Sequence, residues 1–319
     1  MENSKRFWYA LSLLVLLILT ICILKVSECS RRNLERKLLA ERQLALRALK
    51  KDFSFDILIF TQHWPYTVCA QWMEHHKGNE CILPKVRNSW SIHGVWPTKY
   101  HEIGPLFCND TWTFDMKQIA DIEDDMKEKW INIEKGTPLD GLWKHEWEKH
   151  GTCAAQQIPN MNTENKYFSK GLEMFNNFSI TKLLQETYIK PGIDATYKLD
   201  EIHTAINRTI GNNFAIICEK DHQTKQQLLF EIRMCFDKEF KFHSCEGIVV
   251  KDEVLLGHTK DEIITNCKKD VEILYPSSSW VAKKEWLMKI KEHMPQEKSW
   301  LYQVENVYKL VKLLQWATL

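Results

Sequence analysis

The sequence predicts an α+β fold, in which helices and strands are mixed without regular alternation. The chain has 319 residues, 44% of them hydrophobic, which supports one large domain or two small ones. Strand-like and helix-like segments follow one another in no fixed order over residues 53–276. This part of the chain holds no CxxC pair, and its even set of cysteines favours a disulfide framework over a metal cluster. The eight cysteines are Cys69, Cys81, Cys108, Cys153, Cys218, Cys235, Cys245 and Cys267.

The N-terminus begins with an apolar run over residues 7–24, preceded by two basic residues. Its length of about 18 residues lies between the core of a signal peptide and a membrane span. Small residues would allow cleavage after Cys29, so residues 1–29 are expected to be a signal peptide or an uncleaved signal anchor that associates with a membrane. Residues 30–52 are basic with interspersed leucines, and predict an amphipathic stalk or a linker.

The charge is unevenly distributed along the chain. Residues 1–51 contain eleven Lys and Arg and four Glu, a net charge of +7, so the remainder carries −6 within a total of +1. The folded part therefore lacks the broad basic surface that binds nucleic acid by neutralising many phosphates. If it acts on nucleic acid, it must use a short local cleft.

Three glycosylation sequons accompany the cysteines and the apolar N-terminus, at Asn109, Asn177 and Asn207. The three features together indicate the secretory pathway. Basic residues after the apolar run would favour a cytosolic location instead. The cysteines outweigh that signal, because a disulfide-rich domain does not mature in a reducing compartment.

The elements of the folded part begin with a strand over 53–60, whose apolar residues alternate and then run together. A second strand follows, with His93 near its end because Pro97 is expected to stop it. Residues 277–319 carry apolar side chains at helical spacing and predict a helical extension. This extension either packs on the domain, which we favour, or lies on a membrane or a partner. Between these segments the sequence predicts helices at 114–133, 167–175, 180–188 and 201–209, strands at 214–218 and 228–236, and a disulfide-tied hairpin at 232–245.

Residues 144–153 concentrate ionisable side chains on a predicted helix. At about 100° per residue, His145, Glu146, Lys149 and His150 share one side, and Trp147 points into the core. The pattern is compatible with a polar surface helix, a zinc site or an acid/base site. The motif resembles HExxH, but its second histidine stands at i+5, which places the two imidazoles about 140° apart on an α-helix. That spacing suits one tetrahedral ion poorly, so no metal is expected.

Two motifs stand together: Ser91-Ile92-His93-Gly94-Val95-Trp96-Pro97 and His145-Glu146-Trp147-Glu148-Lys149-His150-Gly151-Thr152-Cys153. As a pair they resemble the two active-site signatures of the T2 family of ribonucleases, the acid RNases that are secreted or lysosomal. The resemblance extends to Phe60-Thr61-Gln62-His63-Trp64-Pro65 and covers residues 53–276. Taken alone, His63 is expected to be structural. The resemblance implies a T2-ribonuclease-like fold with a central antiparallel sheet flanked by helices, and the disulfides Cys69–Cys81, Cys108–Cys153, Cys218–Cys267 and Cys235–Cys245. Cys22 and Cys29 have no counterpart.

The resemblance implies metal-independent and cofactor-independent cleavage of single-stranded RNA. The ribose 2′-OH attacks the adjacent phosphorus and a 2′,3′-cyclic phosphate forms, so DNA is expected to be inert. His150 would be the base and His93 the acid. Glu146 and Lys149 would stabilise the transition state, and His145 would bind phosphate.

The residues that would recognise the nucleobase of the RNA match the family less fully than the catalytic residues do. Trp96 is expected to stack a base. The family often has an acidic residue after Trp-Pro, where this chain has Thr98, which puts any base preference in doubt. The family also suggests an acidic pH optimum and a location outside the cell or in the lysosomal lumen, with or without a membrane anchor.

Two alternatives belong to other functional classes. A catalytically silent protein of the same fold would act as a secreted binding protein, and a zinc hydrolase would need a metal. Retention of the full set of acid, base and phosphate-binding side chains favours the ribonuclease, since a silent protein would be free to lose one.

Overall fold

The structure is a computed structural model that describes residues 53–75, 78–211, 213–256 and 263–293, with a few residues between 25 and 39. The chain divides into two compact units, 1–52 and 53–319. In the described part, no helix is both long enough and apolar enough to cross a bilayer. The predicted signal segment, including residues 7–24, lies almost wholly outside the described residues, so its role stays a prediction.

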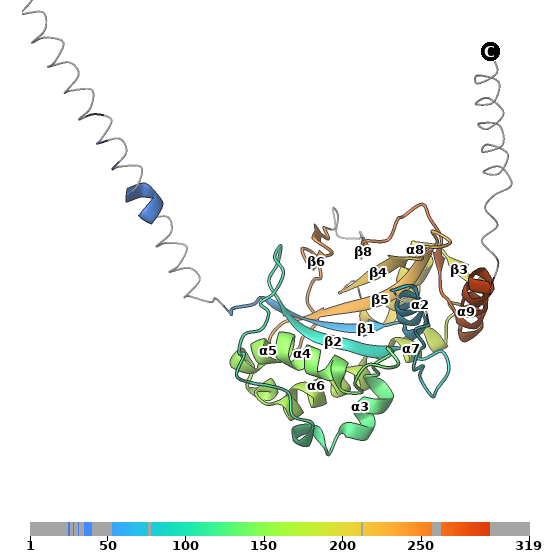
Figure 1. Cartoon of the computed structure of the whole chain (residues 1–319), viewed down its shortest axis with the longest axis horizontal. Coiled ribbons are helices and arrows are strands. Elements are labelled where there is room, and N and C mark those ends of the chain that lie inside the picture. The colour runs from blue at the N-terminus through green and yellow to red at the C-terminus, as the bar shows by residue number, and fades with distance from the viewer. Residues whose placement is uncertain are drawn as a thin grey trace, which may run out of the picture. The chain divides into compact units, whose positions relative to one another are not determined.

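A mixed sheet forms the centre of the second unit (Figure 1). Its long strands pair antiparallel, as the resemblance implied, but β8 joins β4 and β9 joins β5 in parallel. The predicted central antiparallel sheet is therefore confirmed for the long strands, and the short strands β8 and β9 add parallel pairs that the prediction did not include. Two-residue strands give no alternation that a sequence pattern could reveal. The strand order is β2-β1-β5-β4-β8, with β1 Ile57–His63, β2 Ser91–Thr98, β3 Thr196–Tyr197, β4 Phe214–Lys220, β5 Gln227–Phe236, β8 Ile264–Thr265 and β9 Ile273–Leu274; β6 Val249–Val250 and β7 Glu253–Val254 form a separate pair.

Helices α3 to α6 gather on one side of β1 and β2 in Figure 1. The predicted helix at 114–133 is wrong in extent, because a 3₁₀ turn and a shorter helix replace it. Asp115 caps the 3₁₀ turn by accepting from the Lys117 amide, and Trp130 is fully buried just beyond the helix. The bounds are α2 Pro65–His75, η1 Met116–Ile119, α3 Glu123–Lys129, α4 Gly141–Glu146, η2 Trp147–Gly151, α5 Thr152–Gln157, η3 Pro159–Met161, α6 Glu164–Asn177, α7 Ile180–Gln185, α8 Leu199–Ile210 and α9 Ser278–His293.

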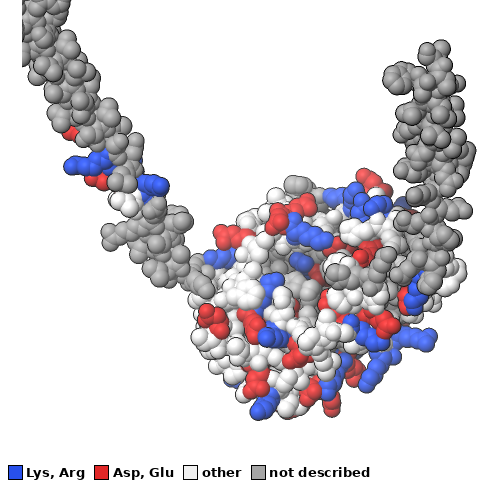
Figure 2. Space-filling view, viewed as in Figure 1, with Lys and Arg blue, Asp and Glu red and all other residues white. Residues whose placement is uncertain are grey.

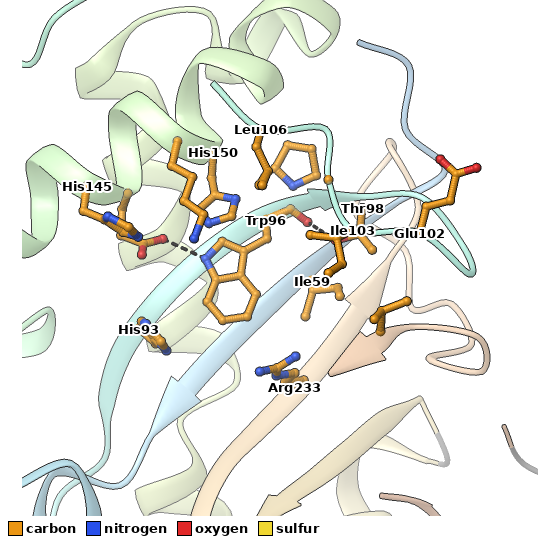
Figure 3. Close-up of a pocket in the computed structure, with 15 residues that line it drawn as sticks. Ile59, His93, Trp96, Thr98, Glu102, Ile103, Leu106, His145, His150 and Arg233 are labelled. Carbon is orange, nitrogen blue, oxygen red and sulfur yellow. Dashed lines mark hydrogen bonds between the residues drawn. The ribbon is translucent and has the colours of Figure 1, made fainter. Parts of the chain in front are cut away.

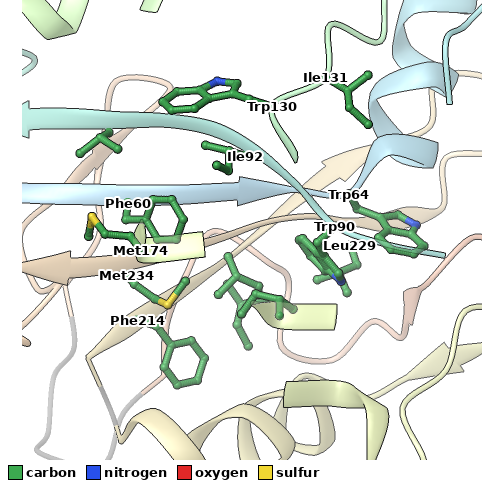
Figure 4. Close-up of a cluster of buried hydrophobic side chains, with 14 of the residues drawn as sticks. Phe60, Trp64, Trp90, Ile92, Trp130, Ile131, Met174, Phe214, Leu229 and Met234 are labelled. Carbon is green, nitrogen blue, oxygen red and sulfur yellow. The ribbon is translucent and has the colours of Figure 1, made fainter. Parts of the chain in front are cut away.

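Tryptophans organise the hydrophobic core (Figure 4). Trp64, Trp90, Trp130 and Trp143 are fully buried, and each indole N–H donates to an oxygen at 2.7–2.8 Å. Such partners remove the cost of burying an indole N–H. The Trp130 indole donates to the backbone carbonyl of His93 at 2.8 Å, so the core holds the backbone of the second strand in place.

The C-terminal helix α9 packs against α2, and its side chains Trp280 and Val281 are buried. Lys284 on α9 is buried and forms ion pairs with Glu74 on α2, at 2.7 Å, and with Asp221 after β4. The first helix of the predicted extension thus packs on the rest of the second unit. Residues 294–319 lie outside the described residues, and the domain boundary at 276 stays a prediction.

All four disulfides that the resemblance implied are present, which confirms the predicted pairing. Cys108–Cys153 joins the loop after β2 to the start of α5, and Cys235–Cys245 joins the end of β5 to the segment that follows it. The three sequon asparagines are exposed or half-buried. Their glycosylation stays a prediction.

Candidate active site

A β-bulge presents His93. Thr61 on β1 pairs with Gly94 and the next residue, Gln62, pairs with Ile92, so His93 is the extra residue of β2. A bulge re-aims a side chain, and bulges are common beside active sites. The prediction that Pro97 stops the strand is wrong, because β2 continues through Pro97 to Thr98, and His93 lies near its beginning. Proline is tolerated there because β2 is an edge strand.

The helical segment 141–157 contains a π turn at Trp147–Gly151. A π turn closes i→i+5 hydrogen bonds, so residues five positions apart lie closer to one face of the helix than they do in a regular α-helix. The rings of His145 and His150 therefore approach to 6.4 Å between centroids. The expected separation of about 140° assumed a regular α-helix and is wrong.

The π turn also changes the argument about metal. Ligand atoms of His145, Glu146 and His150 lie within 4.8 Å of one another, so spacing alone does not exclude an ion. The expectation that the reaction needs no metal stays a prediction, to be tested with a chelator.

The two motifs line one cavity of about 230 Å³ (Figure 3). Arg233 from β5 completes its wall opposite the helical segment. The structure thus brings every predicted acid, base and phosphate-binding residue to one place. Those residues are His93, His145, Glu146, Lys149 and His150, and Trp96, predicted to stack a nucleobase, lines the same cavity.

A second cavity, of about 500 Å³, adjoins the first, and His93 and His145 line both. Gln71, Asn132 and Phe230 are among the side chains that form the rest of its wall. The two histidines thus lie between two spaces, each large enough for part of a ligand.

Burial controls the charge of Glu146. Its side chain is 1% exposed and accepts a hydrogen bond from the Trp96 indole at 2.7 Å. Burial raises the pKa of Glu146 to about 7, although His93, Trp96 and Lys149 lower it. Below neutral pH this carboxyl is therefore largely protonated and can donate a hydrogen bond.

His150 and His93 have opposite pKa shifts. Burial, followed by repulsion from Lys149, lowers the pKa of His150 well below its usual value. Burial also opposes protonation of His93, but attraction to Glu231 and their hydrogen bond outweigh it and raise the pKa of His93. Near the usual histidine value of about 6.5, His150 is thus mostly neutral and His93 mostly protonated. Among the described residues, the buried Nδ1 of His150 has no hydrogen-bond partner.

Sequence reasoning missed Glu231 and Arg233, which lie on β5 next to the first motif. The signal was available, because two charged residues interrupt an apolar strand and buried charges are rare unless paired. His63, predicted to be structural, also lies beside the site, with its ring centroid 5.1 Å from that of His93. Burial lowers the pKa of His63 to about 3, so it is neutral.

Comparison with known proteins gives consistent matches. Residues 55–245 match the model of the Ribonuclease T2 family. The chain is 35% identical to Ribonuclease Oy of Magallana gigas over 228 residues, 71% of this chain and 97% of that protein. It is 33% identical to Ribonuclease T2 of Homo sapiens over 195 residues, 60% of this chain and 71% of that protein. The crystal structure of human RNase T2 matches with a TM-score of 0.54 and 30% identity, over 70% of this chain and 99% of that one.

Proposed function

We propose, since this chain belongs to the ribonuclease T2 family, that it is an endoribonuclease that cleaves single-stranded RNA through a 2′,3′-cyclic phosphate. One observation carries the proposal: His93 and His150 line the same cavity with opposite pKa shifts. Transphosphorylation needs one group that takes a proton and one that gives a proton in the same step.

In the proposed reaction His150 takes the proton of the ribose 2′-OH. The 2′-oxygen then forms a bond to phosphorus and the bond from phosphorus to the 5′-oxygen breaks. His93 gives its proton to the leaving 5′-oxygen. Its Nδ1 faces Glu231 at 2.6 Å, so the proton given is the one on Nε2.

The developing charge on the phosphate oxygens is stabilised by Lys149 and by Glu146. The lysine supplies a positive charge, and the protonated carboxyl of Glu146 donates a hydrogen bond below neutral pH. His145 binds a phosphate oxygen from the mouth of the cavity. The pairing of Glu146 with the Trp96 indole supports this assignment, because it keeps one carboxyl oxygen occupied and leaves the other for the substrate.

The two cavities suit the two nucleotides that flank the scissile phosphate, because the histidines lie between them. Trp96 is proposed to stack the base in the smaller cavity. On the face that Figure 2 shows, Lys and Arg side chains are interspersed with Asp and Glu, without a broad patch of one sign. Recognition therefore rests on the cavities and on the few cations inside them.

The test incubates the purified protein with end-labelled single-stranded RNA in the presence of excess chelator. We expect 2′,3′-cyclic phosphate ends from the wild type, and a loss of at least about 100-fold in rate for His93→Ala and for His150→Ala. DNA of the same sequence is the matched control and is expected to remain intact. Activity that persists in both alanine variants would refute the assigned roles, and activity abolished by the chelator would indicate a metal enzyme.

The disulfide-rich family fold suggests the secretory pathway. We extend this to a glycosylated catalytic unit outside the cell or in the lysosomal lumen. An endoglycosidase is expected to increase the electrophoretic mobility of the cell-derived protein. N-terminal sequencing of the mature chain then distinguishes a cleaved signal peptide from a retained anchor. An unmodified chain recovered from the cytosol would contradict this location.

A further inference from the structure

Glu231 is a buried carboxylate on the central strand β5 that contacts His93 of the candidate site. Its side chain is 1% exposed, and its Oε1 lies 2.6 Å from Nδ1 of His93. The two residues are 138 positions apart in the sequence. Because β5 pairs with both β1 and β4, the carboxylate stands on a rigid part of the sheet. A rigid support is what a group that orients a catalytic side chain requires.

Arg233 donates hydrogen bonds to the other oxygen of the Glu231 carboxylate. Its Nε and Nη2 donate to Oε2 of Glu231 at 2.8 Å and 2.7 Å. Residues two apart on a strand share a face, which explains how one strand supplies both partners. The attraction of Arg233 and His93 exceeds the effect of burial and lowers the pKa of Glu231 to about 2. The carboxylate is therefore ionised throughout the pH range in which the histidines titrate.

Arg233 also contacts the base-binding side of the cavity. Its guanidinium carbon lies 5.0 Å from the centre of the Trp96 ring, and Trp96 donates to Glu146. Figure 3 shows Arg233 below Trp96, on the side away from the helical segment. Arg233 thus contacts both the Glu231 carboxylate, which bonds His93, and the Trp96 indole, which bonds Glu146.

We propose that Glu231 is the positioning residue of His93 and that Arg233 fixes the Glu231 carboxylate in the orientation this requires. The inference rests on the proposed ribonuclease function. With Oε1 accepting from Nδ1–H, the ring has one orientation and its Nε2 faces the cavity. Glu231 itself touches no substrate and acts through the histidine.

The carboxylate also sets the pH range in which His93 is an acid. The ionisable groups that face this ring are His63 from β1, Glu231 and Arg233 from β5, and His145, Glu146 and His150 from the helical segment. Of the carboxylates among them, only Glu231 has a lowered pKa, and that of Glu146 is raised to about 7. Within the described residues, removal of the Glu231 charge therefore removes the main permanent attraction for a proton on His93.

The test replaces Glu231 with glutamine, which keeps the size and an amide oxygen but removes the charge. The alkaline limb of the kcat/KM profile reports the pKa of His93, and we expect it to move to lower pH by about 1 unit or more, the effect of one adjacent carboxylate. Glu231→Asp, which retains the charge, is expected to restore part of the shift. A merely structural role for Glu231 would lower stability and leave the limb in place.

The matched control is Glu74→Gln. Glu74 on α2 is also a buried carboxylate, with 7% of its side chain exposed. It pairs with the buried Lys284 of α9 and lines neither cavity. We expect this variant to lose stability without moving the alkaline limb. If Glu231→Gln does not fold because Arg233 is left unpaired, the double variant Glu231→Gln with Arg233→Met removes both charges. It is expected to shift the limb in the same direction but by less, because Arg233 opposes protonation of His93. An unmoved limb in the folded double variant would contradict the role of Glu231.

A second measurement is independent of catalysis. Titration of the His93 ring by NMR, with the ring nitrogens labelled, reports both its pKa and which nitrogen carries the proton. We expect Nδ1 to be protonated in the neutral ring of the wild type, and the pKa to fall in Glu231→Gln. An unchanged His93 titration overturns the positioning role even if the enzyme is active. A wild type without nuclease activity refutes the proposed function, and the titration still decides the role of Glu231.

Discussion

The close approach of Gly94 to Glu146 leads to a quantitative prediction. A Cβ atom built on Gly94 would lie 2.0 Å from Oε2 of Glu146 and 2.1 Å from Nε1 of Trp96. Cβ atoms essentially never approach heavy atoms closer than 3.0 Å, so both groups must move by about 1 Å. Because Glu146 is 1% exposed and bonded to that indole, the movement breaks their hydrogen bond and displaces the carboxyl from the cavity.

The substitution Gly94→Ala is therefore expected to reduce kcat/KM by about 100-fold, since a misplacement of about 1 Å commonly costs that factor. This corresponds to about 2.7 kcal/mol of transition-state stabilisation. The assay measures the initial rate of cleavage of a fluorescent RNA oligonucleotide across pH. The melting temperature of the same sample shows whether the fold is intact.

Gly192→Ala is the control for generic crowding. A Cβ at Gly192 would lie 2.8 Å from the Cβ of Ala195, which is also too close but away from the cavity. This variant is expected to lose stability and keep its kcat/KM. If Gly94→Ala is folded and retains kcat/KM within about threefold of the wild type, the reasoning that links Glu146 position to catalysis is refuted.

Three further predictions concern pH, the buried ion pairs and a disulfide. Activity requires protonated His93, present below its raised pKa, and neutral His150, present above its lowered pKa. The pH–rate profile is therefore expected to be a bell whose alkaline limb lies above about pH 6.5 and whose acid limb lies below it. A profile with both limbs on the same side of that value would contradict the assignment. Lys284→Met removes the cation that pairs with the buried Glu74 and Asp221, and is expected to lower the free energy of unfolding by about 3–5 kcal/mol in chemical denaturation. The loss is expected to be largest above about pH 4, because this lysine lowers the pKa of Asp221 despite the burial of that carboxyl. Equal stability of the variant and the wild type at neutral pH would contradict this. Replacement of Cys108–Cys153 by two alanines opens a 45-residue loop and is expected to lower the free energy of unfolding by about 4 kcal/mol, from the loss of the loop constraint on the unfolded chain. Urea unfolding measures this difference. A loss below about 1 kcal/mol would show that the disulfide does little for the fold.

Local patterns were sufficient for the long strands and for the residues that line the candidate site. The alternation and apolar run before His63 predicted β1, and the apolar run around Glu231 predicted β5. Short elements were not predictable in this way. The helix expected at 114–133 breaks after a 3₁₀ turn, and the two-residue strands β8 and β9 carry no periodicity of their own.

The sequence by itself determined which side chains carry the proposed chemistry and which cysteines pair, because two compact motifs and the cysteine pattern are specific to one family. The tertiary structure alone decided how those side chains meet. The bulge that presents His93 depends on its register with β1, and the π turn that brings His150 above His145 departs from the regular helix that spacing implies. Glu231 reaches His93 across 138 residues. Register, helical irregularity and long-range contact arise from packing of the whole chain, so no local pattern encodes them.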